Sequence, residues 1–101
     1  MKRMMVQYRV RADQAAANEQ YVLAVFTQLA ERQPSGLRYA SFKLDDGVSF
    51  VHIVSQETDG GNPLAELPAF KAFTAAIAER CDEPPVATKL NEVGSYRLFG
   101  D

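Results

Sequence analysis

The chain is poor in the residues that build covalent or metal-held frameworks. Its 101 residues include one cysteine, one histidine and no tryptophan. A single cysteine excludes an intramolecular disulfide framework and a cysteine-rich zinc site. The sequence also lacks a P-loop, a dinucleotide fingerprint and a metalloprotease motif. We therefore expect no metal site and no flavin or haem cofactor.

Long apolar runs and an excess of one charge are also absent. No window approaches the roughly 20 apolar residues of a membrane span, and residues 1–13 lack the features of a signal peptide. Eleven basic and thirteen acidic residues give a formal net charge of −2, whereas a nucleic-acid binder is usually basic. These observations predict a cytoplasmic protein that binds neither membranes nor nucleic acid.

What is present is the composition of an ordinary globular domain, with 47% hydrophobic and 24% charged residues. The length predicts one domain over residues 1–101. Residues 4–11 alternate as a strand. Asp13 is a candidate N-cap for a helix that ends at residues 34–36. The spacing of three and four residues predicts one buried helical stripe, made by Val22, Val25, Phe26 and Leu29.

Two further strands are expected at residues 37–44 and 48–55. The Asp46-Gly47 pair between them is typical of a type I′ hairpin. Pro63 is expected to open a short helical turn capped by Asn62, after a loop at residues 58–62.

Pro68 is expected to start a longer helix that reaches Cys81 and that ends before Pro84 and Pro85. Residues 86–90 read as a short extended piece and residues 93–99 as the fourth strand. The order β-α-β-β-α-β is the ferredoxin-like, α+β pattern, with a four-stranded antiparallel sheet and helices on one face.

The third strand is apolar on both sides. Phe50, His52 and Val54 share one face, and Val51 and Ile53 share the other. A sheet that is apolar on both faces is usually covered on both. A second copy of the chain is the simplest cover, so we expect a homodimer formed through the open sheet faces.

Three segments resemble the dimeric α+β barrel superfamily, and within it the antibiotic-biosynthesis-monooxygenase-like domains. They are the first strand at residues 5–11, the FVHIV strand at 50–54 and the LPAFKAF helix start at 67–73. The resemblance covers nearly the whole chain. It implies a dimeric α+β barrel whose relatives include cofactor-free oxygenases of aromatic polyketides, haem-degrading enzymes, lactone isomerases and proteins with no known activity.

The catalytic residue sets of that superfamily do not carry over. The haem-degrading branch uses an asparagine on the first strand, a tryptophan, and a histidine on the second helix. This chain has Gln7 on its first strand, no tryptophan, and no histidine on that helix. The histidine–aspartate pair of another branch is also missing, because Ile53 follows His52. The resemblance therefore implies the fold more strongly than any reaction.

Candidate chemistry centres on His52, whose ordinary pKa suits a general base; the alternative is a histidine that fills a core or an interface. Arg9 is a candidate donor to a substrate oxygen. It shares one face of the first strand with Arg11 and Gln7, and Arg97 on the fourth strand is a further candidate beside them. The alternative is a charge at an interface or an edge. Candidate substrate-binding residues are aromatic, and each could instead be ordinary core: Tyr8, Tyr39, Tyr96, Phe26, Phe70 and Phe73.

Cys81 is a poor candidate nucleophile, because the end of a helix disfavours a thiolate. Two functions remain open. One is a cofactor-independent monooxygenase acting on a small aromatic or polyketide-like substrate, with His52 as base and Arg9 and a tyrosine holding the substrate oxygen. The other is a non-catalytic homodimer that binds an apolar ligand or has a structural role.

Overall fold

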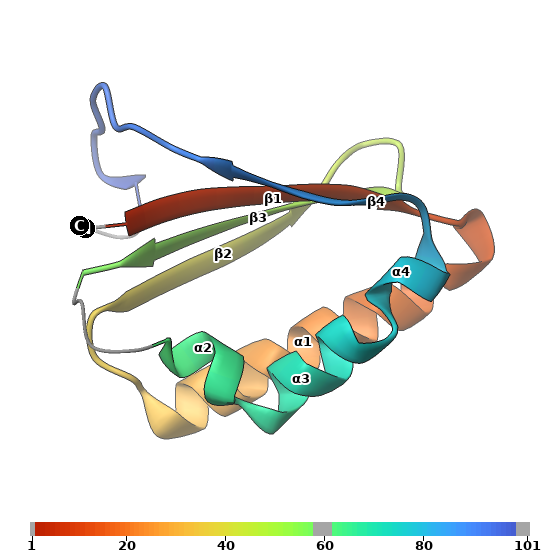
Figure 1. Ribbon diagram of the computed structural model, residues 1–101, viewed down its shortest axis with the longest axis horizontal. Coiled ribbons are helices and arrows are strands. Elements are labelled where there is room, and N and C mark those ends of the chain that lie inside the picture. The colour runs from red at the N-terminus through yellow and green to blue at the C-terminus, as the bar shows by residue number, and fades with distance from the viewer. Residues whose placement is uncertain (1, 58–61, 99–101) are drawn as a thin grey trace.

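The computed structural model describes residues 2–57 and 62–98. Four antiparallel strands form one sheet in the order β2-β3-β1-β4, and the helices lie together on one face of it (Figure 1). The ferredoxin-like arrangement is thereby confirmed. The elements are β1 (Lys2–Val10), η1 (Ala12–Gln14), α1 (Ala15–Arg32), β2 (Leu37–Lys43), β3 (Ser49–Gln56), α2 (Pro63–Glu66), α3 (Pro68–Ala75), α4 (Ile77–Arg80) and β4 (Cys81–Lys89).

Alternation along the central strands sorts their side chains between the two faces. In the β1–β3 pair, Tyr8 lies opposite Phe50 and Val6 opposite His52. Tyr8, Phe50 and His52 are buried beneath the helices. Val10, on the same face, is fully buried. The core therefore lies between this face and the helices.

The long helix α1 begins later than its cap signal predicted. Asp13 lies inside the 3-10 turn η1 and does not cap α1; the N-cap residue is Gln14, which makes no side-chain cap bond. The predicted stripe is correct, because Val22 and Val25 are buried. Phe26 and Leu29 pack against the core from the same stripe.

The expected hairpin joins β2 and β3, but its turn is not type I′. That turn needs positive φ at both central residues, and of this loop only Gly47 has it, at 76°. The Asp46 side chain instead accepts hydrogen bonds from the backbone nitrogens of Val48 and Ser49, at 2.9 and 2.8 Å. The backbone nitrogen of Gly47 also donates to the Leu44 carbonyl at 3.0 Å, so backbone and side-chain hydrogen bonds together close a turn of another type.

The second helical segment is shorter and more broken than expected. The Asn62 side chain caps α2 by accepting from the Ala65 nitrogen, as predicted. The helix that Pro68 opens stops at Ala75, and Ala76 has non-helical torsions before the short helix α4. Cys81 does not extend a helix; it is the first residue of β4. The predicted loop at 58–62 lies, except for Asn62, outside the described residues.

The fourth strand was predicted in the wrong place. It occupies Cys81–Lys89 and contains Pro84 and Pro85, which a strand tolerates at a sheet edge because the proline lacks only an outward donor. The register with β1 shifts beside these prolines. The segment predicted as the strand continues past the end of β4 (Figure 1). Its Val93 and Tyr96 are exposed, at 102% and 83%, and Phe99 lies outside the described residues.

The face of the sheet away from the helices is uncovered in the monomer and carries apolar side chains. Phe42 and Val86 are 50% and 62% exposed. Met5 lies opposite Ile53, and Phe42 opposite Val51, in the strand registers. We call these five residues the open sheet face. Among residues 2–57 and 62–98, no helix is both long and apolar enough to cross a membrane.

Phe73 tests whether the helix–sheet core is tightly packed. Its ring is 6% exposed and lies 5.4 Å from the His52 ring and 6.2 Å from the Tyr8 ring, centroid to centroid. Phe73→Ala should lower the free energy of unfolding by about 3–5 kcal/mol, because the lost ring leaves a cavity. Chemical denaturation measures this. Leu23→Ala, at a 51% exposed position of α1, is the control and should cost under about 1 kcal/mol. An equally small loss for Phe73→Ala would mean that the ring only lines open space.

A candidate ligand pocket with a buried hydrogen-bond chain

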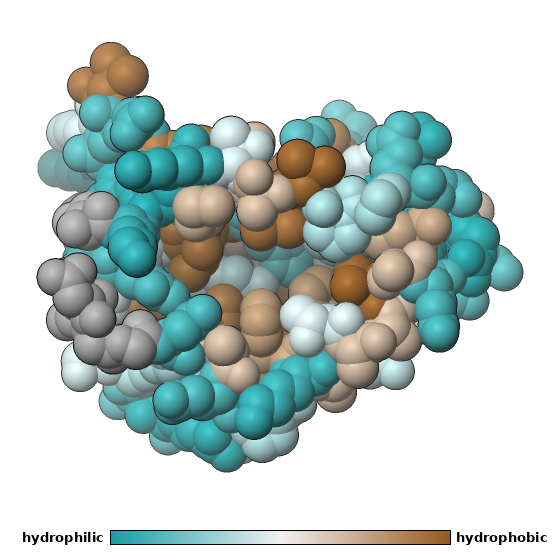
Figure 2. Space-filling model, in the orientation of Figure 1, coloured by the Kyte–Doolittle hydropathy of each residue, from teal (hydrophilic) through white to brown (hydrophobic). Residues whose placement is uncertain are grey.

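A cavity of about 400 Å³ lies between the sheet and the helical layer. Figure 2 shows it as a hollow between the two layers, with apolar side chains around it. Phe70, Phe73 and Ile77 line it from the helices, and β1 and β3 contribute Val6 and Val54. This volume matches a small organic ligand.

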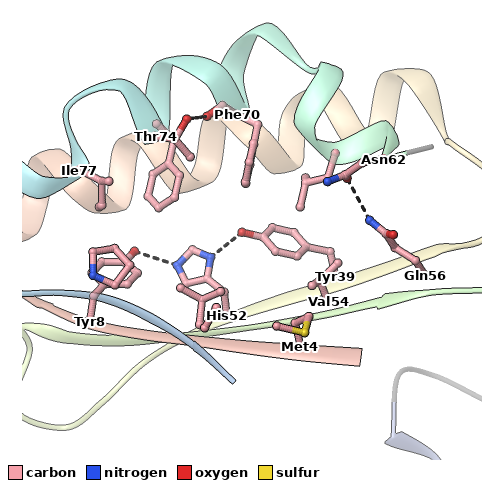
Figure 3. A pocket seen from close by; sticks show the side chains of 15 residues that line it. Met4, Tyr8, Tyr39, His52, Val54, Gln56, Asn62, Phe70, Thr74 and Ile77 are labelled. Atoms are coloured by element: carbon pink, nitrogen blue, oxygen red, sulfur yellow. Dashed lines mark hydrogen bonds between the residues drawn. The ribbon is translucent and has the colours of Figure 1, made fainter. Parts of the chain in front are cut away.

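The polar groups of the cavity gather around His52, which is 4% exposed. The Tyr8 hydroxyl lies 2.8 Å from His52 Nε2, and the Tyr39 hydroxyl bonds Nδ1 on the other side of the ring (Figure 3). Ser41 Oγ makes a longer contact of 3.3 Å with Nε2. Both imidazole nitrogens are thus occupied by tyrosine hydroxyls. At the other end of the pocket, Gln56 Nε2 donates to Asn62 Oδ1 at 2.9 Å (Figure 3).

A second row of polar residues supports the first from the helices. Asn18 Nδ2 donates to the Tyr8 hydroxyl at 2.9 Å. Arg80 Nε donates to Asn18 Oδ1 at 3.2 Å, and Arg80 Nη2 to the Phe73 carbonyl at 2.8 Å. Asn18 is 0% exposed and Arg80 4%. Together, Arg80, Asn18, Tyr8, His52 and Tyr39 form one continuous chain of hydrogen bonds, which we call the buried relay.

Burial keeps the titratable rings of the relay uncharged. It lowers the pKa of His52 to about 4. It raises the pKa of Tyr8 to about 12, against the opposing effect of the Asn18 hydrogen bond. Burial raises the pKa of Tyr39 further still. At neutral pH all three rings are therefore neutral, and the charge of the relay resides on Arg80.

The structure brings together most, but not all, of the residues that the sequence singled out. His52, Tyr8, Tyr39, Phe70 and Phe73 all line the cavity. Phe26 does not: it lines a separate cavity of about 230 Å³, which Tyr39 also borders. Its ring stacks on that of Tyr39 with centroids 5.2 Å apart. Phe26 therefore supports the site through Tyr39.

Arg9 and Tyr96 lie away from the cavity. Arg9 follows Tyr8, so alternation places it on the opposite face of the sheet, where its guanidinium lies 3.6 Å from the Glu83 carboxylate. Tyr96 lies beyond β4, with the Arg97 guanidinium 5.1 Å from its ring centroid. The expected grouping of Arg9, Arg97 and Tyr96 with His52 does not occur in this structure.

Two residues of the relay, Asn18 and Arg80, were not predicted from the sequence, although the position of Asn18 indicates a buried role. Asn18 lies four residues before Val22, which places it on the buried stripe of α1. A polar residue on such a stripe needs a buried partner. Arg80 had no comparable signal, because its burial depends on the break after α3. Cys81, beside it, is half-buried at the start of β4, and burial raises the pKa of its thiol.

Within the described part of the chain, no group of three or more histidine, cysteine, aspartate or glutamate side chains is placed to hold a metal ion. The polar groups of the pocket are hydroxyls, amides and one imidazole. These groups can donate and accept hydrogen bonds and move a proton.

Solved structures share this fold. A protein of Nitrosomonas europaea that carries the provisional name antibiotic biosynthesis monooxygenase superimposes with a TM-score of 0.77 at 18% identity, covering 93% of this chain and 100% of the other. Rv0793 from Mycobacterium tuberculosis gives 0.75 at 19%, covering 93% and 96%. A Caulobacter crescentus protein with the same provisional name gives 0.71 at 22%, covering 92% and 90%.

No family model matches the sequence, and neither does any curated protein. The structural likeness nevertheless confirms the resemblance to antibiotic-biosynthesis-monooxygenase-like proteins at the level of the fold. At these identities it establishes the fold alone, and the activity must be argued from the pocket.

The depressed pKa of His52 has a consequence for stability. The unfolded chain takes up a proton near pH 6.5, whereas the folded chain does so only near pH 4. The fold should therefore lose roughly 3 kcal/mol as the pH falls through this window. His52 is the sole histidine, so NMR titration of its imidazole gives the folded value directly. The neutral variant His52→Gln should lack this part of the pH dependence. A folded-state midpoint at 6.5 would contradict the burial described here.

Proposed function

We propose that this protein is a cofactor-independent oxygenase of a small aromatic, polyketide-like substrate. The observation that carries the proposal is an apolar cavity of about 400 Å³ whose polar groups at one end are two tyrosine hydroxyls bonded to one buried histidine. Such a reaction needs a site that excludes water, takes up one proton and holds an anion. The pocket offers groups for each of these tasks.

In this proposal, His52 is the base and acts through Tyr8. As the substrate gives a proton to the Tyr8 oxygen, Tyr8 passes its own proton to His52 Nε2, 2.8 Å away. The Tyr39 hydroxyl then donates to the phenolate-type anion, which is the role that the sequence suggested for Arg9. The negative charge of the bound anion offsets the burial that otherwise disfavours a protonated His52.

In this proposal the substrate itself reduces dioxygen. An anthrone-type anion transfers electrons to dioxygen, and a carbon–oxygen bond forms at the activated carbon. The oxygen–oxygen bond then breaks as the same carbon loses its second hydrogen. The products are a quinone carbonyl and one water, so the substrate supplies all the electrons and the two hydrogens. The walls formed by Phe70 and Phe73 shield the reactive anion from solvent.

The second candidate is a non-catalytic protein that binds an apolar ligand in the same pocket. The observation that favours it is that each nitrogen of His52 already has a hydroxyl partner. Its pKa of about 4 also makes the free imidazole a weak base. On this reading Tyr8 and Tyr39 only orient the ligand, and no oxygen is consumed.

Oxygen uptake separates the two candidates. An oxygen electrode should record consumption when the purified protein is mixed with anthrone, with anthraquinone as product. His52→Ala and the milder His52→Gln should each abolish it, because both remove the imidazole that receives the proton. Thr27→Ala is the folded control and should retain it, because among the described residues the Thr27 hydroxyl bonds only the Leu23 carbonyl of its own helix. Anthrone binding without oxygen uptake by the wild-type protein would favour the second candidate.

We further propose that the open sheet face pairs with its counterpart on a second copy, giving a homodimer. The support is the apolar character of Met5, Phe42, Val51, Ile53 and Val86 on that face, with Phe42 and Val86 at least half exposed in the monomer. A stable pairing of this kind should bury more than about 1,000 Å² in total.

The dimer proposal is tested by Phe42→Asp, which places a charge in the expected interface, on the edge strand β2. Analytical ultracentrifugation should find the wild-type protein dimeric at micromolar concentration and the variant monomeric, because burying an unpaired carboxylate is costly. Leu23→Asp, equally exposed but on α1, is the matched control and should stay dimeric. A monomeric wild-type protein would overturn the proposal.

A further inference from the structure

The buried relay has a direction, and Arg80 sets it. A guanidinium can only donate hydrogen bonds. Because Arg80 Nε lies 3.2 Å from Asn18 Oδ1, that oxygen is the acceptor and the amide nitrogen of Asn18 must face Tyr8. The opposite amide orientation would place two donors against each other and leave both unpaired in a buried site.

The same reasoning carries through the next three groups. The Tyr8 oxygen accepts from Asn18 Nδ2 at 2.9 Å, and among the described residues the only other partner of this hydroxyl is His52 Nε2, at 2.8 Å. Tyr8 is 3% exposed whereas Tyr39 is only partly buried, so an unpaired hydrogen costs more on Tyr8 than on Tyr39. The hydrogen of Tyr8 is therefore assigned to the bond with Nε2. A neutral imidazole has one donor and one acceptor nitrogen. With Nε2 accepting, Nδ1 carries the hydrogen and donates it to the Tyr39 oxygen.

The last hydrogen of the relay is that of Tyr39. Among the described residues, the Tyr39 hydroxyl has no hydrogen-bond partner other than His52, and Tyr39 lines the cavity. Every bond before it donates in one direction, from a permanent cation towards the pocket. Hydrogen bonds aligned in this way polarise one another, which strengthens the final donor.

We propose that Arg80 and Asn18 are positioning residues that hold His52 as its Nδ1–H tautomer, so that Tyr39 presents its O–H to the pocket and selects ligands with an anionic or strongly accepting oxygen. The tautomer half of this inference is independent of any reaction. The ligand half rests on the proposed function, because it assigns the pocket to a ligand and names the oxygen that the pocket would hold.

Asn18→Asp reverses the relay with almost no change of shape. The new carboxylate can only accept, so it takes hydrogen bonds from both Arg80 and Tyr8. Tyr8 then no longer donates to His52 and must accept from Nε2. The imidazole becomes the Nε2–H tautomer, Nδ1 accepts from Tyr39, and the pocket loses its donor.

The tautomer is read from the ¹⁵N spectrum of histidine-labelled protein, which contains one imidazole. We expect Nδ1–H in the wild type and Nε2–H in Asn18→Asp. Ser41→Ala removes the 3.3 Å contact with Nε2, the one side-chain hydrogen bond of Ser41 within residues 2–57 and 62–98, and should leave the tautomer as it is in the wild type. An Nε2–H wild type, or an Asn18→Asp variant that keeps Nδ1–H, would overturn the inference. The wild-type spectrum tests it even if the variant fails to fold.

The ligand half is tested with two probes of similar shape, 4-nitrophenolate and 4-nitrotoluene. Asn18→Asp should weaken binding of the phenolate by about tenfold or more, because a hydrogen bond to a charged oxygen is lost. It should leave 4-nitrotoluene binding unchanged. Equal loss for both probes, or no binding of either to the wild type, overturns the ligand half. Phenolate selectivity without oxygen uptake from anthrone would instead overturn only the oxygenase proposal.

Discussion

A buried polar side chain must find hydrogen-bond partners inside the protein, and at His52 this need links the sheet to the helices. Ser41 and His52 are register partners across β2 and β3, and Val6 and His52 across β1 and β3. Tyr39 lies two residues before Ser41 and Tyr8 two residues after Val6, so both are on the same face as His52. The two hydroxyls that occupy the imidazole are therefore products of strand register. A slip of one residue in either pair would turn a tyrosine to the other face of the sheet and leave a nitrogen of His52 unpaired.

The same hydrogen bonds explain an irregularity in the helical layer. In a continuous helix, the Phe73 carbonyl would accept from the backbone nitrogen four residues later, at Ile77. The break at Ala76 frees that carbonyl, and Arg80 Nη2 takes it at 2.8 Å. The break also lets α4 turn the Arg80 side chain under the helices, where the guanidinium lies 4.4 Å from the centroid of the Tyr21 ring. The break in the helix thus provides the carbonyl that holds Arg80, the first residue of the buried relay, in place.

Local patterns in the sequence predicted the elements well where hydrophobic periodicity decides them, and poorly where tertiary position does. The alternation of β1 correctly separated Tyr8 from Arg9, but which of them faces the helices depends on packing. Pro84 and Pro85 read as a helix stop, yet they lie within the edge strand β4, since an edge position cannot be recognised from propensity alone. Of the relay, His52, Tyr8 and Tyr39 were identified from their chemistry. Asn18 could have been found from its place on the buried stripe, whereas Arg80 could not, because a break in the helix creates its position.

Burial weakens His52 as a base but strengthens the tyrosine hydroxyls as hydrogen-bond donors. It weakens His52 as a free base, with a pKa near 4, and it keeps Tyr8 and Tyr39 protonated far above neutral pH. It also removes the water that would compete for hydrogen bonds, so a fixed donor acts more strongly on a developing negative charge than it would in solvent. The ring groups are neutral at pH 7, and the guanidinium of Arg80 lies behind Asn18. An anionic oxygen at Tyr39 would therefore meet oriented dipoles and no competing carboxylate among the residues that line the cavity. Such a site favours the ionised form of a ligand through preorganised donors, and it does so without placing a formal charge in the pocket wall.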